Sequence, residues 1–180
     1  MAQPVELVPL VCPRCSMPIP ANEEEAAWVC TQCGQGIYLD GLSGPVAQEI
    51  HYAAGVAPNT PGKPFWVAEA RVSIHRTAFQ GGSKQNAEAV QFWSQPRRFF
   101  VPAYQGSLDE QLRLGMQMVR QPPAHPEGPP ISFLPVRLYK EDVLSAVEFI
   151  VMAIEAERAD KLKQVQFSLE LSEPVLWILP

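Results

Sequence analysis

The sequence predicts an α+β fold, in which a small cysteine-containing module precedes a mostly antiparallel sheet with two helices. Four cysteines form two closely spaced pairs within residues 12–33. Segments 64–79 and 165–171 alternate apolar with polar residues, as half-buried strands do. Segments 107–120 and 140–162 carry apolar residues at helical spacing. These patterns together favour an α+β domain behind the cysteine module.

The first element is the cysteine module. Cys12 and Cys15 are separated by two residues, and so are Cys30 and Cys33. That spacing lets a tight turn present both sulfurs to one ion, and four thiolates at about 2.3 Å complete a tetrahedron. Soft ligands in this geometry select zinc or iron. Redox-active dithiols are the alternative, but neither pair precedes a helical pattern, as such dithiols usually do. The four cysteines are therefore the predicted metal ligands.

Residues 11–40 resemble the zinc-ribbon superfamily, a rubredoxin-like arrangement of short strands joined by two metal-binding turns. The resemblance rests on the four cysteines and on the apolar residues that flank each pair. It implies one structural zinc ion, bound by Cys12, Cys15, Cys30 and Cys33. Some members of the superfamily bind nucleic acid and others bind protein. Rubredoxins bind iron but space their cysteine pairs more widely, so an iron-binding redox protein stays open as an alternative.

The predicted domain plan has three parts. Residues 1–40 form the zinc ribbon, 41–63 a linker, and 64–180 the α+β domain, for which no family resemblance is found. The linker is turn-rich, with a short strand or helical turn over 46–56. The chain of 180 residues is long enough for a small module and a domain of about 140 residues.

The larger domain opens with a strand over 64–79, followed by a loop over 80–87. Residues 89–104 then predict a strand interrupted at Pro96 and Pro102, because proline is confined to the edges, ends or bulges of strands.

The second half of the chain begins with a capping box at Ser107 and Glu110, which predicts a helix over 107–120. The remaining elements are a strand over 131–138, a helix over 140–162, a strand over 165–171, and an apolar segment over 174–180. That last segment fits either a core strand or a docking peptide. The helix over 140–162 is apolar nearly all round at its start, so it lies in the core or against a partner or a membrane surface.

Charge argues against nucleic acid as the partner. Residues 1–40 hold one base and five acids, so they carry −4 of the net −5. A module that grips phosphates should be basic. The one cluster of basic and aromatic residues is Arg97 and Arg98 beside Phe99 and Phe100. It could stack bases, or it could be a strand whose aromatic residues lie in the core.

The sequence favours a non-enzymatic adaptor or accessory subunit that mediates protein–protein interaction. A closed site of four thiolates offers no bound water for catalysis. The three histidines are far apart, and no nucleophile motif or phosphate-binding glycine loop is present. The N-terminus lacks a secretory signal, and no apolar stretch is long enough to span a membrane, so we expect a cytoplasmic protein. Nucleic-acid binding is the alternative function, and iron-based redox chemistry is the second.

Overall fold

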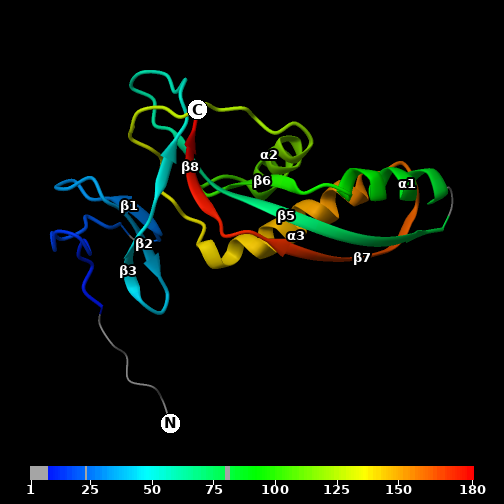
Figure 1. The fold of residues 1–180 in the computed structure, drawn as a ribbon, viewed down its shortest axis with the longest axis horizontal. Coiled ribbons are helices and arrows are strands. Elements are labelled where there is room, and N and C mark those ends of the chain that lie inside the picture. The colour runs from blue at the N-terminus through cyan, green and yellow to red at the C-terminus, as the bar shows by residue number, and fades with distance from the viewer. Residues whose placement is uncertain (1–7, 23, 80–81) are drawn as a thin grey trace, which may run out of the picture.

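The computed structural model describes residues 8–22, 24–79 and 82–180. Within these residues the chain forms two sheets and three α-helices (Figure 1). The smaller sheet contains β1 (Ala27–Val29), β2 (Gly36–Asp40) and β3 (Gly44–Ala47). The larger sheet contains β4 (Ile50–Tyr52), β5 (Lys63–Ala78), β6 (Arg97–Pro102), β7 (Leu162–Leu171) and β8 (Val175–Leu179). The helices are α1 (Gly82–Trp93), α2 (Leu108–Arg120) and α3 (Val143–Ala156), the last preceded by a 3-10 turn, Lys140–Asp142.

The long strand β5 organises the larger sheet. One of its edges pairs first with β8 and then with β7, and the other edge pairs with β6 over Phe65–Ala70. All of these pairings are antiparallel, whereas β4 joins the far edge of β8 in parallel. The sheet is therefore mostly antiparallel, as predicted.

The main core lies on the face of β5 that carries Trp66, Ala70 and Val72. All three helices contribute buried side chains to this core, including Trp93 of α1 and Val147 of α3. Among the described residues, the opposite face is covered at one end of β5, where Phe65, Val67 and Phe100 are buried against residues of α2. Towards the other end this second face is bare, since Arg71, Ser73 and His75 are exposed there. The alternation of exposed and buried residues predicted from the sequence is confirmed over this half.

The small sheet is fixed to the larger domain. The Ala26 N–H donates to the carbonyl of Val136 at 2.8 Å. Tyr38 packs edge-on against Trp66, with ring centroids 5.6 Å apart, and its hydroxyl donates to Glu141. This hydrogen bond and burial together raise the pKa of Tyr38. Because Ala26, Ala27 and Tyr38 belong to the main core, the two sheets share one hydrophobic interior.

The prediction of two helices is wrong, since the described residues contain three. Helix α1 replaces most of the predicted loop over 80–87 and the start of the predicted strand over 89–104; residues 80–81 lie outside the described residues. The strand itself is shorter, because β6 begins only after Pro96 and ends at Pro102. The fold class, α+β, is confirmed.

Two further elements differ from their predictions. Residues 131–138 form an extended segment with a single isolated bridge from Phe133 to Gly62 rather than a strand. Prolines at 129, 130 and 135 remove the donors that a longer ladder requires. The predicted helix over 140–162 is shorter: α3 ends at Ala156, and β7 already begins at Leu162.

Other predictions are confirmed. The backbone N–H of Glu110 donates to Ser107 Oγ at the start of α2, although the Glu110 carboxylate meets the serine hydroxyl rather than its amide. The apolar segment at 174–180 carries the core strand β8.

Segment 41–63, predicted as a linker, carries β3 and β4. None of the helices in the described residues is long and apolar enough to cross a membrane.

Candidate metal centre

Two turns of the same shape hold the four cysteines. The N–H of Ser16 donates to the carbonyl of Cys12 at 2.9 Å, and the N–H of Gly34 donates to that of Cys30 at 2.9 Å. Ser16 and Gly34 both adopt left-handed backbone angles, with φ of 58° and 72°. Glycine takes this conformation at low cost, whereas serine is strained by it. Each turn thus reverses the chain immediately after its second cysteine.

The turns face one another and bring all four sulfurs together. The Sγ atoms of Cys12 and Cys33 lie 3.6 Å apart, and those of Cys15 and Cys30 lie 3.5 Å apart. All four sulfurs lie within 4.8 Å of one another. A disulfide needs about 2.05 Å between sulfurs, and each close contact joins one turn to the other. The cysteines are therefore four free thiols arranged around one point.

This arrangement fits a tetrahedral metal ion. Four sulfurs at about 2.3 Å from a central ion lie about 3.8 Å apart, which is close to the two shortest separations. Cys12 and Cys30 are buried, and Cys15 and Cys33 are half-buried. Ile19, Trp28 and Ile37 pack against these cysteines in a small core of their own. The four predicted ligands are thus brought together at a site that could hold a metal ion.

Backbone amides favour ionisation at one position of the site. The N–H groups of Cys33 and Gln32 donate to the Cys30 sulfur and lower the pKa of that thiol to about 6, although burial opposes this. At Cys15 a backbone hydrogen bond from Met17 acts in the same direction. Burial and hydrogen bonds to the other three cysteines outweigh it and raise the pKa to about 12. The turn around Cys30 therefore favours the thiolate form, which is the form that binds a cation.

A carboxylate braces the loop between the two turns. Glu25 accepts hydrogen bonds from the indole N–H of Trp28 at 2.7 Å and from the backbone N–H of Asn22 at 3.1 Å. Although burial opposes ionisation, these bonds hold the pKa of Glu25 below its usual value. The hydrogen bond to Glu25 thus fixes the indole of Trp28 within the small core that contains the cysteines.

The basic and aromatic cluster is a structural feature of β6. Phe99 and Phe100 are buried. The Arg97 guanidinium lies 4.1 Å from the centroid of the Phe92 ring and donates to the Phe92 carbonyl at 2.7 Å. Only Arg98 extends into solvent. The aromatic rings that base stacking would need are thus used by the fold itself.

Sequence reasoning missed an apolar groove between α2 and α3. The groove is lined by Leu108, Leu112, Leu138, Ala146, Phe149 and Ile150, with a cavity of about 140 Å³, and we call it the α2–α3 groove. Leu108 is 76% exposed and Phe149 is 60% exposed. The apolar circumference of the helix over 140–162 was the one signal for this surface.

Compared with protein-family models, curated proteins and solved structures, the chain matches none of them. The likeness to zinc ribbons therefore rests on the four clustered cysteines.

Proposed function

We propose that this protein is a non-enzymatic adaptor, in which one structural zinc ion holds the cysteine module and the α2–α3 groove binds a protein partner. The observation that carries the proposal is the exposure of large apolar side chains on two adjacent helices. Met152, three residues after Phe149 and 41% exposed, extends this apolar surface along α3. Contiguous exposed apolar surface of this kind marks interaction sites in soluble proteins.

The lining of the α2–α3 groove favours binding over catalysis. Gln111 is the one residue with a polar side chain among those that line it. A catalytic pocket needs several convergent polar groups or groups with perturbed pKa values, and this groove offers an amide alone. A closed four-thiolate zinc site likewise has no open position for a substrate or a reactive water.

Charges beside the groove indicate the chemistry of the partner. Asp142 precedes Ala146 by four residues, so their side chains lie on the same side of α3. Asp109 precedes Leu112 by three residues and is placed similarly on α2. Both carboxylates are exposed. A partner helix with an apolar stripe flanked by basic residues would complement this surface.

Zinc is proposed over iron because the two cysteine pairs are separated by only 14 residues, which is a shorter spacing than in rubredoxins. The two sulfur pairs fit a closed structural site, which is the usual role of four-thiolate zinc. Elemental analysis of protein purified without added metal should give one zinc per chain and a colourless solution. Red-brown protein containing iron would instead support the redox alternative.

The adaptor role is tested with one variant in the groove and one matched control. Phe149→Ser removes an exposed aromatic ring from the α2–α3 groove, whereas Leu42→Ser removes an apolar side chain that is 99% exposed in the β2–β3 turn. The tagged full chain is expressed in its native cells, cross-linked and purified with its neighbours. We expect one protein to be recovered with the unmodified chain and with Leu42→Ser but to be lost with Phe149→Ser.

Recovery of the same protein with all three chains would contradict the groove as the docking site. If no protein is recovered with any of the three, the adaptor role itself is wrong. Gel-shift assays at low salt test the nucleic-acid alternative, which requires binding that weakens steeply as salt is added.

A further inference from the structure

Half of one edge of β5 has no partner strand among the residues that the structure describes. On that edge β6 pairs with β5 from Phe65 to Ala70, where Ala70 lies opposite Arg97. On the other edge β7 continues alongside β5 to Ala78. Between Arg71 and Ala78 the described part of the chain therefore pairs β5 on one side only.

The direction of the backbone groups follows from the ladder. The carbonyl of Glu69 accepts from the N–H of Ser172, so the backbone N–H and C=O of Glu69 point towards the β7 edge. The carbonyl of Pro64 accepts from the N–H of Ala103, so the backbone groups of even-numbered residues of β5 point towards the β6 edge. Successive residues of a strand alternate in this respect. The N–H and C=O groups of Val72 and Ile74 hence point to the edge that β6 has left.

Neither backbone amide is used elsewhere in the described residues. The hydrogen bonds outside the strand ladders include none to the backbone of Val72 or Ile74. Unpaired edge groups of this kind are a template for another extended chain. Their N–H and C=O groups repeat every second residue, about 6.6 Å apart, which is the spacing that an added strand matches.

The chain stops β6 from covering this edge. The register would place residue 95 opposite Val72, but β6 begins only at Arg97. Helix α1 ends only at Trp93, so Ser94, Gln95 and Pro96 form the turn that leads into β6. The side chain of Arg97 is held back on the carbonyl of Phe92, which fixes the turn away from β5.

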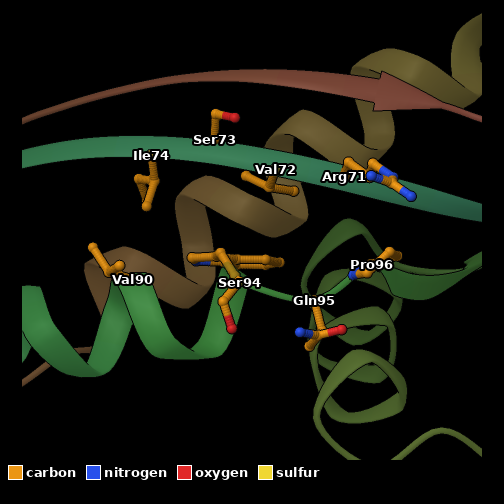
Figure 2. A pocket seen from close by; sticks show the side chains of 9 residues that line it. Arg71, Val72, Ser73, Ile74, Val90, Ser94, Gln95 and Pro96 are labelled. Carbon is orange, nitrogen blue, oxygen red and sulfur yellow. The ribbon is translucent and has the colours of Figure 1, made fainter.

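A cavity lies along the free edge, between β5 and the end of α1. Its volume is about 440 Å³. Figure 2 shows Val72 and Ile74 on β5 facing Val90 and Ser94, with Gln95 and Pro96 closing one end. The cavity thus offers apolar side chains from two elements next to unpaired backbone groups.

We propose that an extended segment of a partner protein adds to the β5 edge as a strand, pairing with Val72 and Ile74. The partner backbone supplies the N–H and C=O groups that β6 would have supplied. Its alternate side chains fall on two faces. Those beside Val72 and Ile74 meet Val90 and Trp93 and should be apolar, and those beside Arg71 and Ser73 reach the bare polar face. This site goes beyond the adaptor proposal and does not depend on the α2–α3 groove.

The probe is a phage-displayed library of linear dodecapeptides selected on the full, metal-loaded chain. Each selected peptide is synthesised, and amide hydrogen exchange of the protein is measured with and without it. For at least one peptide, exchange at Val72 and Ile74 should slow by about tenfold or more on saturation. Exchange at Arg71 and Ser73 should stay unchanged, because their amides already face β7.

N-methylation separates strand addition from contact through side chains. Methylating alternate amides of the bound peptide should abolish binding in one phase, where the N–H groups face β5. In the other phase methylation should leave binding intact, because those N–H groups point away. Equal sensitivity in both phases, or in neither, would overturn the proposal.

Variants of β5 give an independent test. Ile74→Pro removes a backbone N–H that points to the free edge and has no acceptor among the described residues. It should lower the affinity for the selected peptide by at least about tenfold. Leu42→Ser, in the distant β2–β3 turn, should leave binding unchanged. If Ile74→Pro does not fold, as judged by circular dichroism, the methylation series decides alone.

Two outcomes would overturn the proposal outright. One is that no selected peptide slows exchange at Val72 and Ile74. This would happen if every peptide bound in the α2–α3 groove instead, and loss of binding in Phe149→Ser would reveal that. The other is that the chain dimerises in solution through this edge, so that a second copy already protects both amides.

Discussion

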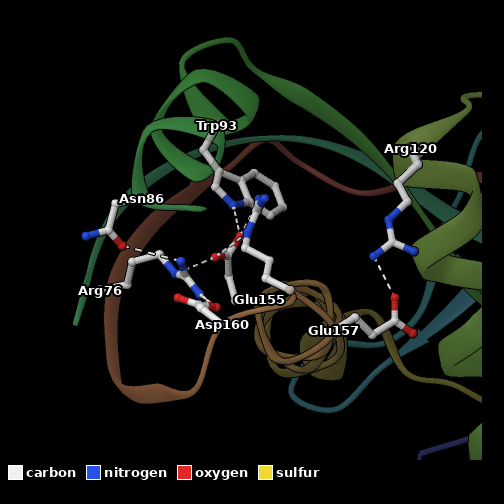
Figure 3. A network of polar contacts seen from close by, with 8 residues as sticks. Arg76, Asn86, Trp93, Arg120, Glu155, Glu157 and Asp160 are labelled. Carbon is white, nitrogen blue, oxygen red and sulfur yellow. Dashed lines mark hydrogen bonds and ion pairs between the residues drawn. The ribbon is translucent and has the colours of Figure 1, made fainter. Parts of the chain in front are cut away.

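Replacing Glu155 with glutamine should destabilise the protein far more than the near-identical shape of the two side chains suggests. The Glu155 side chain is 0% exposed. Its carboxylate accepts from the Trp93 indole at 2.8 Å and twice from the Arg158 guanidinium, also at 2.8 Å (Figure 3). Arg76 on β5 adds an ion pair, with its Nε 3.0 Å from Glu155 Oε2. Glu155 thereby joins α1, α3 and β5.

The expected loss is about 3–5 kcal/mol of unfolding free energy, as for the removal of one partner from a buried ion pair. Glutamine carries no charge, so Asp160 would be the one carboxylate left beside the guanidinium groups of Arg76 and Arg158. Its NH₂ group would also face guanidinium donors in place of an acceptor. For a chain of this length the loss corresponds to a fall in Tm of roughly 6–20 °C.

Urea unfolding of the zinc-loaded protein, followed by circular dichroism, measures the loss. Glu157→Gln is the matched control, because Glu157 also pairs with an arginine, Arg120, at 2.7 Å. Its side chain is 51% exposed, so the substitution should cost less than about 1 kcal/mol. The two variants differ by two positions and share the same chemistry, which isolates the effect of burial.

Equal losses in the two variants, both below about 1 kcal/mol, would refute this reasoning. Such a result would mean that water reaches the Glu155 carboxylate. An unchanged m-value in both variants would confirm that only stability, and not the extent of unfolding, had been altered.

Three other predictions concern pH, backbone strain and metal. The Arg76 guanidinium beside Asp160 lowers the pKa of that buried carboxyl. The stability that this pair contributes is therefore complete above about pH 4 and is lost as the pH falls through the folded-state pKa of Asp160. In acid unfolding, Asp160→Asn should make the stability depend less steeply on pH in this range. Gly34→Ala should weaken zinc binding by about 1 kcal/mol, because φ at this position is +72°, where an alanine backbone is strained although nothing lies near an added Cβ. Ser16→Gly should strengthen zinc binding, because it relieves the same strain. Competition with a chelator measures both effects. Removal of zinc by a chelator should expose the buried Trp28 and shift its fluorescence to the red, reversibly on adding zinc.

The clustering of the four cysteines was predictable because its determinants are local. Each cysteine pair and its turn occupy a few consecutive residues, and the residue types carry the chemistry. The start of α2 was predictable for the same reason, since Ser107 and Glu110 form the cap within four residues. The partition into residues 1–40, 41–63 and 64–180 stays a prediction.

Helix α1 was missed because its signal is weak and its stabilisation is not local. The glycine pair at 81–82 and the polar residues that follow are typical of a loop. In the described part of α1 only Ala89 and Trp93 are buried, four residues apart. Trp93 is held by Glu155, which lies 62 positions further along the chain. Tertiary contacts therefore decide this helix, as they often do.

The free edge of β5 could not be read from the sequence either. It depends on where β6 stops and on which side β7 and β8 lie, and these are properties of the whole sheet. The α2–α3 groove is similar, because an apolar circumference on α3 does not by itself reveal which side neighbouring elements cover.

The pairing of β5 with β8 has a consequence for folding during synthesis. Lys63 and Pro64 lie opposite Leu179 and Ile178. More than a hundred further residues must therefore be synthesised before β8 can cover this end of β5. The four cysteines and the strands β1, β2 and β3 all lie within the first 47 residues. On the ribosome we therefore expect the small sheet to form first and the large sheet to close last, with the β8 edge of β5 exposed in between.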